Sequence, residues 1–379
     1  MNLITSEAVS IGHPDKVADQ ISDAMLDECL RQDKNSRVAI ETMVTTNTVF
    51  MAGEITTHAD VDIDGLVRGV VKDIGYDFEG FNYDNLTITR HIHRQSPDIA
   101  LGVDRDGAGD QGMMFGYAEG DVTTNYMPIP IYYAQKIMKE FQFRRVCEDW
   151  CNRNLRPDAK CQITYDLDAE KIRTIVISHQ HKDTMNKDEL RLKCIDVIMK
   201  VIPQNLLYNL QFLNFDDKYS LDDEKTFVFV NPTGRFVEGG PANDTGLTGR
   251  KIVVDTYGGV GRIGGGAFSG KDPSKVDRSA AYMCRYVAKN LVASGKCRKA
   301  EVSVAYAIGV AEPVQISVNT FGTGNDTKLT EYVKQTYDFR PKAIIEKLGL
   351  KTPYGWSYRD TAQNGHFTST KFPWEQINK

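Results

Sequence analysis

A glycine-rich segment with cations around it is the part of the chain best suited to chemistry. Seven glycines lie within residues 258–270. Glycine lets backbone N–H groups approach a ligand that a Cβ would block. Several such N–H groups in one concavity, followed by the positive end of a helix, form an anion site. The segment therefore predicts a pocket for an anionic ligand.

The charge around this segment agrees with that prediction. From Arg250 to Lys289 the chain has eight basic and three acidic residues, whereas the whole chain has a net charge of −5. A cationic, glycine-lined pocket in an acidic protein favours a small polyanion, and a nucleoside triphosphate is the first expectation. A flexible surface loop with scattered lysines is the alternative.

The segment nearly contains a known phosphate-binding motif. Gly265–Lys271 fits G-x4-G-K, but Asp272 stands where a Ser or Thr would hold magnesium. The sequence therefore argues against an ordinary P-loop NTPase. It also lacks the G-x-S-x-G elbow of acyl-transfer enzymes.

A second candidate lies just before the first predicted helix, in the residues SIGHPD at 10–15. Pro14 suits a first helical turn, so His13 would stand at a helix N-terminus that could face phosphates. A purely structural hydrogen-bonding role is the alternative for a lone histidine. Asp15 would offer carboxylate oxygens to magnesium near a triphosphate.

Other histidines and the cysteines give no metal signal. His91 with His93, and His179 with His181, share a strand face at i,i+2, but further ligands at a metal-site spacing are missing. We expect both pairs at solvent-facing positions. The seven cysteines have no framework spacing, which predicts reduced, buried thiols rather than zinc ligands.

Composition excludes several classes of protein. A pI near 5.9 argues against nucleic-acid binding through a broad basic face. The sequence has no run of about eighteen apolar residues that could cross a membrane. Its first residues lack the pattern of a signal peptide, so a cytoplasmic protein is expected.

Hydrophobic periodicity predicts a threefold internal repeat of helix, hairpin, helix and strand. The predicted helices are 16–33, 61–74, 132–147, 187–202, 277–294 and 328–337. The predicted strands are 37–44, 48–56, 85–93, 161–165, 171–180, 225–230, 300–308 and 314–321, with a leading strand expected before each unit. The corresponding domains are 1–98, 112–230 and 231–379.

This pattern describes three small sheets with helices on one face. Since the other face of each sheet must also be buried, we expect an oligomer with a large flat interface. Residues 95–111 resemble a lid or linker, and residues 204–224 a polar surface insertion. The aromatic segment 341–379 would wrap around the outside of the last unit.

Long motifs resemble those of the S-adenosylmethionine synthetase family over nearly the whole chain. They are GHPDK at 12–16, GEITT at 53–57, GAGDQG at 107–112, RPDAK at 156–160, NPTGRFVEGGP at 231–241, DTGLTGRKIVVDTYGG at 244–259 and GGGAFSGKDPSKVDRSAAY at 264–282. The resemblance implies an α+β fold of three βαββαβ-type repeats around a pseudo-threefold axis. One face of each sheet would be covered by helices and the other packed in a dimer interface.

The resemblance also implies a reaction. The adenosyl group of ATP passes to the sulfur of L-methionine by in-line displacement at C5′, and the bound triphosphate is then hydrolysed to pyrophosphate and phosphate. A thioether has no proton to lose, so the enzyme must supply positioning and charge stabilisation rather than a general base. Two Mg2+ and one K+ per site are implied, in a dimer or dimer of dimers with active sites between subunits.

Site residues follow motif by motif. The residues implied to stabilise the departing triphosphate are His13, Lys160, Arg250 and Lys271. Those implied to complete the ATP site are Asp158, Ala159, Arg235, Phe236, Asp244, Lys251 and Ala267. Those implied to surround methionine are Glu54, Gln95, Asp110, Asp244 and Lys275, with residues 95–105 as a lid. The implied metal ligands are Asp15 and Asp277 for Mg2+ and Glu41 for K+.

The sequence departs from the family pattern at three places. Ile11 stands where many relatives have a Glu, the segment between Gln95 and Asp110 is shorter than in many members, and residues 204–224 are longer. Two other functions stay open: an ATP-dependent phosphotransferase that leaves ADP, and a nucleotide-binding scaffold without catalysis. The products formed from ATP and methionine would distinguish all three.

Overall fold

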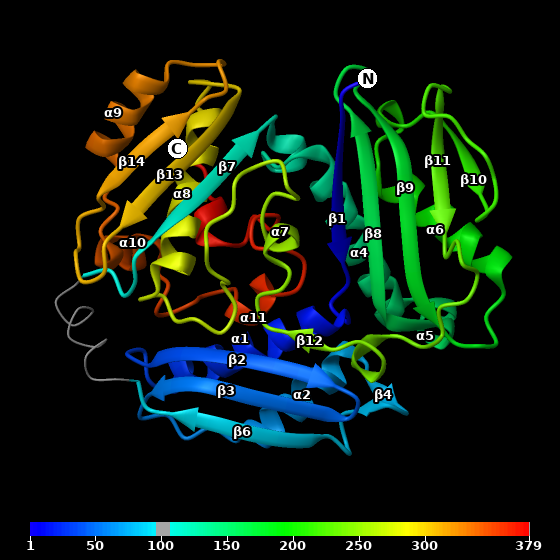
Figure 1. The fold of residues 1–379 in the computed structure, drawn as a ribbon, viewed down its shortest axis with the longest axis horizontal. Helices are drawn as coiled ribbons and strands as arrows, with labels where there is room; N and C mark the ends of the chain where they lie inside the picture. Colours follow the sequence, from blue (N-terminus) through cyan, green and yellow to red (C-terminus); the bar gives the residue numbers. More distant parts are fainter. Residues whose placement is uncertain (96–106, 379) are drawn as a thin grey trace.

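A computed structural model describes residues 1–95 and 107–378, and it has a mixed α+β architecture. Three sheets of three or more strands lie around a central region, which is filled by loops from residues 231–275 and by the C-terminal segment (Figure 1). The predicted α+β class with several small sheets is therefore confirmed.

The first sheet has the strand order β12-β2-β3-β6. Its strands are β2 (Arg37–Thr45), β3 (Thr48–Thr56), β6 (Thr87–His93) and the short β12 (Gly246–Leu247). Along β2, Val38, Ile40 and Val44 are buried, whereas Glu41 and Met43 between them are exposed. This alternation lets helices α1 (Pro14–Gln32) and α2 (Ile63–Ile74) cover one face only. A two-stranded hairpin, β4 (Asp77–Phe78) and β5 (Phe81–Asn82), follows α2.

The second sheet has the order β1-β8-β9-β11-β10. Its strands are β1 (Leu3–Val9), β8 (Leu155–Asp166), β9 (Lys171–His181), β10 (Asn209–Leu213) and β11 (Lys225–Val230). The accompanying helices are α4 (Ile129–Cys147), α5 (Asp149–Asn154) and α6 (Lys187–Val201). Strand β10 was not predicted: part of the expected surface insertion is an edge strand, parallel to β11.

The third sheet has the order β14-β13-β7. Its strands are β7 (Gly112–Glu119), β13 (Lys299–Tyr306) and β14 (Gln315–Asn319), and its helices are α8 (Val276–Ala293), α9 (Asp326–Thr336) and α10 (Pro341–Leu348). The chain also forms the short helices α7 (Ile252–Asp255) and α11 (Tyr358–Thr361). Short 3-10 turns are η1 (Val122–Thr124), η2 (Gln204–Leu206), η3 (Gly240–Ala242) and η4 (Pro373–Glu375).

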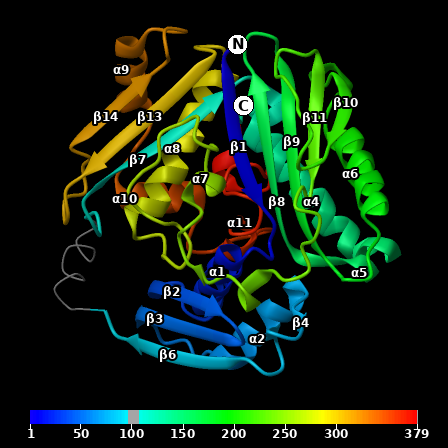
Figure 2. The same cartoon turned by 45° about the vertical axis from the view of Figure 1, so that its right-hand side comes forward.

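The leading strand of each unit lies in the sheet of another unit. Strand β1 precedes α1 but pairs with β8, and β7 precedes α4 but pairs with β13 (Figure 2). In the same way β12 precedes α8 but pairs with β2. Each unit therefore gives one strand to the next in a closed cycle, which ties the three sheets into one body.

The prediction for the C-terminal segment was wrong. Tyr358, Phe367 and Trp374 are fully buried, and the segment lies between the sheets rather than around the outside (Figure 1). The buried Glu375 carboxylate accepts from Arg285 and Lys289, each at 2.8 Å. An aromatic segment buries a large apolar area, which explains why it fills the centre.

Two smaller predictions also need correction. His179 and His181 are buried rather than solvent-facing. The Phe141 ring of α4 packs against the His179 ring, with the ring centroids 4.9 Å apart, and the backbone N–H of Phe236 donates to His181 Nε2 at 3.0 Å. The cysteines are free thiols as predicted, but Cys147 is exposed and only the other six are buried. Within the described ranges the chain has no helix long and apolar enough to cross a membrane.

Candidate active site at the start of helix α1

Helix α1 has an aspartate at every fourth position from its first turn. Residues four apart lie on one side of a helix, so the carboxylates of Asp15, Asp19, Asp23 and Asp27 follow one another along α1. Each carboxylate accepts from the backbone. Asp15 accepts from the Leu247 N–H at 2.9 Å, Asp19 from the Gly249 N–H at 2.8 Å and Asp23 from the Gly270 N–H at 2.9 Å. Asp27 accepts from the N–H groups of Tyr358 and Arg359 at 2.8 Å each. The helix thus fixes the loops that contain the candidate cations.

His13 is the N-cap residue of this helix. Its Nδ1 accepts from the backbone N–H of Asp15 at 3.2 Å, and its side chain is almost completely buried. Burial lowers the pKa of His13 to about 3, with help from the positive charges of Lys251 and Lys160. The ring is therefore neutral at pH 7, and because Nδ1 accepts, the proton lies on Nε2 and can be donated to a ligand.

Asp15 lies among cations. Its Oδ2 is 2.5 Å from Lys251 Nζ, and its Oδ1 is 3.8 Å from Arg250 Nε. Burial alone would raise the pKa of Asp15, but hydrogen bonds from Lys251 and from the backbone of Leu247 hold it below its usual value. Asp15 is therefore an ionised carboxylate next to two predicted phosphate ligands.

The RPDAK motif packs against this same turn. Ser10 Oγ donates to the Pro157 carbonyl at 2.7 Å and accepts from the Ala159 N–H at 2.8 Å. Gly12 is required at this contact, because a Cβ there would lie 2.3 Å from Pro157 Cβ. Two motifs about 145 residues apart thereby meet, and the exposed Lys160 side chain lies near enough to His13 to lower its pKa.

Asp158 connects the first two motifs to a third. Its Oδ2 accepts from the Gly240 N–H at 2.9 Å, whereas its buried Oδ1 has no hydrogen-bond partner among the described residues. Burial raises the pKa of Asp158 to about 6, and the nearby charge of Asp244 adds to this effect. Asp244 itself is exposed.

Two further residues predicted to bind ATP, Arg235 and Phe236, form hydrogen bonds with residues other than His13 and Asp15. The Phe236 N–H donates to His181 Nε2 at 3.0 Å, and its ring lies against Gly239, next to the glycine that binds Asp158. Arg235 is largely exposed, and its Nε lies 3.1 Å from Asp183 Oδ1. The structure therefore does not bring the Arg235 guanidinium into contact with His13 or Asp15.

A second group of predicted residues surrounds a cavity of about 510 Å³ against β2, β3 and β6. Its lining includes Glu41, Glu54, Ala267 and Lys271. Residues predicted to bind potassium, methionine and ATP therefore share one cavity. His91 and His93 also line it, and His93 Nε2 lies 3.2 Å from Glu54 Oε1, a contact that the sequence did not reveal.

Lys271 links this cavity to Asp277. Its Nζ lies 2.7 Å from Asp277 Oδ2. The preceding Gly270 has φ +80°, and a Cβ there would lie 2.0 Å from the Ile40 carbonyl oxygen, so only glycine fits. Arg278, fully buried, donates to the Lys271 carbonyl at 3.2 Å and to the Asp23 carboxylate at 2.6 and 2.9 Å. The backbone that positions Lys271 is thus held from α1.

Three of the residues predicted to bind the substrate methionine are not in the lining of this cavity: Gln95, Asp110 and Lys275. Lys275 forms an ion pair with buried Asp272, which also accepts from the Val38 N–H at 2.7 Å. Asp272 is the residue that follows the partial G-x4-G-K match, at the position where a P-loop has Ser or Thr. Its hydrogen bond to β2 holds the loop in place. Asp110 is exposed, and Gln95 donates its backbone N–H to Thr56 Oγ1 at 3.3 Å. The rest of the predicted lid lies outside the described residues.

The acidic residues suit metal ions that are shared with a ligand. The described residues contain no group of three or more Asp, Glu, His or Cys that could hold a metal by themselves. Asp15 and Asp277 are instead single carboxylates, each beside a lysine. Mg2+ is commonly bound in this way, through one or two carboxylates together with substrate phosphates.

Comparison with known proteins identifies the family. Models of the N-terminal, central and C-terminal domains of S-adenosylmethionine synthetase match residues 1–97, 105–236 and 238–376. An S-adenosylmethionine synthase of Clostridium tetani is 49% identical over 401 residues, covering 100% of this chain and 97% of the relative. One of Desulfosudis oleivorans is 50% identical over 395 residues, covering 100% and 96%.

A solved structure agrees with this match over the whole fold. The structure described as an unusual S-adenosylmethionine synthetase from Campylobacter jejuni superposes with a TM-score of 0.89 at 37% identity, covering 100% of this chain and 97% of that one. The chain therefore belongs to the S-adenosylmethionine synthetase family, the methionine adenosyltransferases.

Proposed function

We propose that this chain joins ATP and L-methionine to form S-adenosylmethionine, and then hydrolyses the bound triphosphate to pyrophosphate and phosphate. The observation that supports this most directly is the meeting of three distant segments, residues 10–16, 157–160 and 240–251, around a neutral His13 and an ionised Asp15. That arrangement offers a hydrogen-bond donor, a carboxylate and several cations to one polyanion.

The chemistry needs no base. A lone pair of the methionine sulfur attacks C5′ of ATP, the C5′–O5′ bond breaks, and its electron pair stays on the triphosphate. His13 Nε2–H would donate to the departing oxygen, since burial keeps the ring neutral. Lys160, Arg250, Lys251 and Lys271 would stabilise the charge on the triphosphate and hold it for the later attack of water on phosphorus.

The nucleoside would bind beside Asp158. Its buried Oδ1 lacks a partner among the described residues, and a donor on the nucleotide would satisfy it. Ala159, Phe236 and Asp244 would complete this side of the pocket, and Arg235 would have to leave Asp183 to join them. Around methionine we propose Glu54, Gln95, Asp110, Asp244 and Lys275, with residues 95–105 as the lid.

We assign two Mg2+ ions to Asp15 and Asp277 and one K+ ion to Glu41. Each aspartate is paired with a lysine, Lys251 or Lys271, that is itself a proposed phosphate ligand. When a triphosphate enters, these ammonium groups can turn to phosphate oxygens and leave the carboxylates free for metal. The metals would neutralise charge that develops on the triphosphate.

We further propose a cytoplasmic dimer or dimer of dimers with active sites between subunits, three domains at 1–98, 112–230 and 231–379, and a pseudo-threefold axis. The cyclic exchange of β1, β7 and β12 among the sheets supports the axis. The sheet faces opposite the helices would form the subunit interface. A monomer in sedimentation at micromolar concentration would contradict the oligomer.

The function is tested by product analysis with ATP, methionine, Mg2+ and K+. S-adenosylmethionine with pyrophosphate and phosphate is the expected result, and omission of methionine is the control. Formation of ADP would instead indicate a phosphotransferase. No turnover, with ATP still bound, would indicate a scaffold and overturn the proposal.

A further inference from the structure

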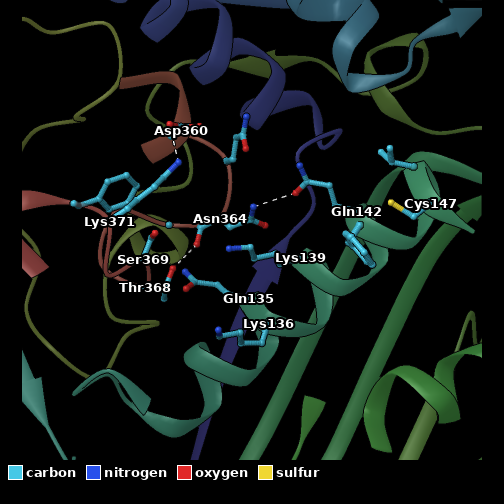
Figure 3. A pocket seen from close by; sticks show the side chains of 15 residues that line it. Gln135, Lys136, Lys139, Gln142, Cys147, Asp360, Asn364, Thr368, Ser369 and Lys371 are labelled. Carbon is cyan, nitrogen blue, oxygen red and sulfur yellow. Dashed lines mark hydrogen bonds and ion pairs between the residues drawn. The ribbon is translucent and has the colours of Figure 1, made fainter. Parts of the chain in front are cut away.

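A cavity of about 400 Å³ lies apart from the candidate active site, between helix α4 and the C-terminal residues 360–372 (Figure 3). Three of its lining residues are lysines: Lys136 and Lys139 from α4, and Lys371 from the opposite wall. Figure 3 shows Lys139 extending from the helix toward the wall that contains Thr368. A volume of this size is typical of small-molecule sites.

The positive charge of this cavity is largely unneutralised. Asp360 is the only acidic residue of its lining, and it already binds Lys371 at 2.8 Å. Within residues 1–95 and 107–378, neither Lys136 nor Lys139 forms an ion pair; Lys136 only faces the Tyr132 ring at 5.2 Å. Partial burial lowers the pKa of Lys139, the charges of Lys136 and Lys371 lower it further, and the charge of Asp360 offsets part of this effect. An anion in the cavity would remove this repulsion.

The uncharged part of the lining suits phosphate oxygens. Ser369 Oγ lies in the wall and makes no hydrogen bond within the described ranges, so it is free to donate. The wall is held in place by the Thr368 hydroxyl, which donates to the Asn364 carbonyl at 2.9 Å, and by the Asn364 amide, which donates to Gln142 Oε1 at 3.1 Å. Ammonium and hydroxyl donors together form strong, charge-assisted bonds to phosphate.

We propose that this cavity is a second anion site, which binds the phosphate group of a small molecule without a metal ion. No metal ion is needed in this proposal, because the one acidic residue of the lining, Asp360, already forms an ion pair with Lys371. An inorganic polyphosphate or a nucleoside monophosphate would supply the same chemistry. The exposed ring of Phe143 beside the lysines offers a surface on which a base could lie.

The walls of this cavity are bonded to the loop of the candidate active site. Gln135, only 3% exposed, donates from Nε2 to the Val254 carbonyl at 2.7 Å. Val254 belongs to α7, the short helix that begins immediately after Arg250 and Lys251. Gly365 is packed against the same amide, so that a Cβ there would lie 2.3 Å from Gln135 Nε2. An occupied cavity would therefore change the KM for ATP, a consequence that rests on the proposed function.

Direct binding tests the site without any need for turnover. The probes are inorganic pyrophosphate and AMP, titrated calorimetrically into the full-length protein without Mg2+. The test variant is Lys136→Gln with Lys139→Gln, and the matched control is Lys328→Gln on the exposed surface of α9. We expect two classes of site per chain for at least one probe in the wild type and the control, and at least a tenfold loss of affinity for one class in the double variant.

The two probes distinguish the sources of the phosphate group. If the class of site that is weakened in the double variant binds pyrophosphate alone, the ligand of the cavity is an inorganic anion. If this class also binds AMP, the ligand is a nucleotide. The proposal is overturned if the double variant weakens none of the classes of site that the wild type and the control show. Ser369→Ala is a second variant that removes no charge, and a severalfold weaker second class in this variant would localise the ligand to the cavity. Failure of S-adenosylmethionine synthesis would affect none of these outcomes.

Discussion

The two cationic regions of the molecule differ in how their charges are balanced. In the candidate active site three partly buried lysines each have a carboxylate: Lys251 with Asp15, Lys271 with Asp277, and Lys275 with Asp272. In the α4 cavity, Lys136 and Lys139 have no such partner among the described residues. The first region can therefore accept metal and polyphosphate together, since each lysine can exchange a carboxylate for a phosphate. The second region can accept only the anion.

The regions also differ in rigidity. The active-site loops are anchored by hydrogen bonds to buried aspartates of α1, whereas the cavity lysines stand on a partly exposed helix surface. A buried, hydrogen-bonded charge is costly to disrupt, and an exposed lysine is not. Substitutions should therefore affect stability in the first region and only ligand binding in the second.

The largest expected effect is on stability, from Asp23→Ala. This change leaves the fully buried Arg278 guanidinium without its carboxylate and removes the acceptor of the Gly270 N–H. Breaking a buried ion pair costs about 3–5 kcal/mol. Chemical denaturation should show this loss, whereas Lys139→Ala should stay within about 0.5 kcal/mol of the wild type. Equal stability of both variants would mean that α1 does not anchor the loop.

The next effect is on turnover, from Lys271→Ala. A positive charge directed at the departing triphosphate in a site with little water contributes a few kcal/mol, so we expect at least a tenfold lower kcat. Lys271→Arg should recover part of the rate, because it keeps the charge. Lys139→Ala, which removes a lysine from the other region, should leave the initial rate within about twofold. A near wild-type rate for Lys271→Ala would remove this residue from the site.

A smaller effect is expected on the metal requirement, from Asp277→Asn. An amide is a weaker ligand for Mg2+ than a carboxylate, so half-maximal activity should need several times more Mg2+. The matched change in the other region is Asp360→Asn, which should leave the Mg2+ titration unaltered. If the two variants titrate alike, Asp277 is not a metal ligand.

The sequence predicted the local elements and the chemistry better than their assembly. Periodicity located the helices and hairpins, and the long motifs identified residues that the structure brings together, such as His13, Asp15 and Lys251. Periodicity cannot say which sheet a strand joins, so the exchange of β1 and β7 between units was not foreseen.

Some misses had a visible signal. Asp19, Asp23 and Asp27 continue the four-residue spacing that begins at Asp15, but charged residues on a helix are usually solvated. Only the structure shows that Asp19 and Asp23 are buried against loops. The buried position of His179 was also missed, because a strand covered by a helix and an exposed strand have the same period of two.

The smallest effect concerns pH and separates the two regions by the ionisation of one lysine. The pKa of Lys139 is lowered by partial burial and by the charges of Lys136 and Lys371, and the charge of Asp360 offsets only part of this effect. The ammonium of Lys139 therefore loses its proton at a lower pH than an ordinary lysine. Anion binding at the cavity should therefore weaken as pH rises, and the bound anion should draw a proton onto Lys139. Sulfate is the suitable probe, because it does not itself titrate between pH 7.5 and 9.5. We expect at least a roughly twofold loss of affinity over this range in the wild type. Lys139→Arg, which stays charged, should abolish this loss, and an equal pH dependence in both proteins would show that Lys139 does not face the anion.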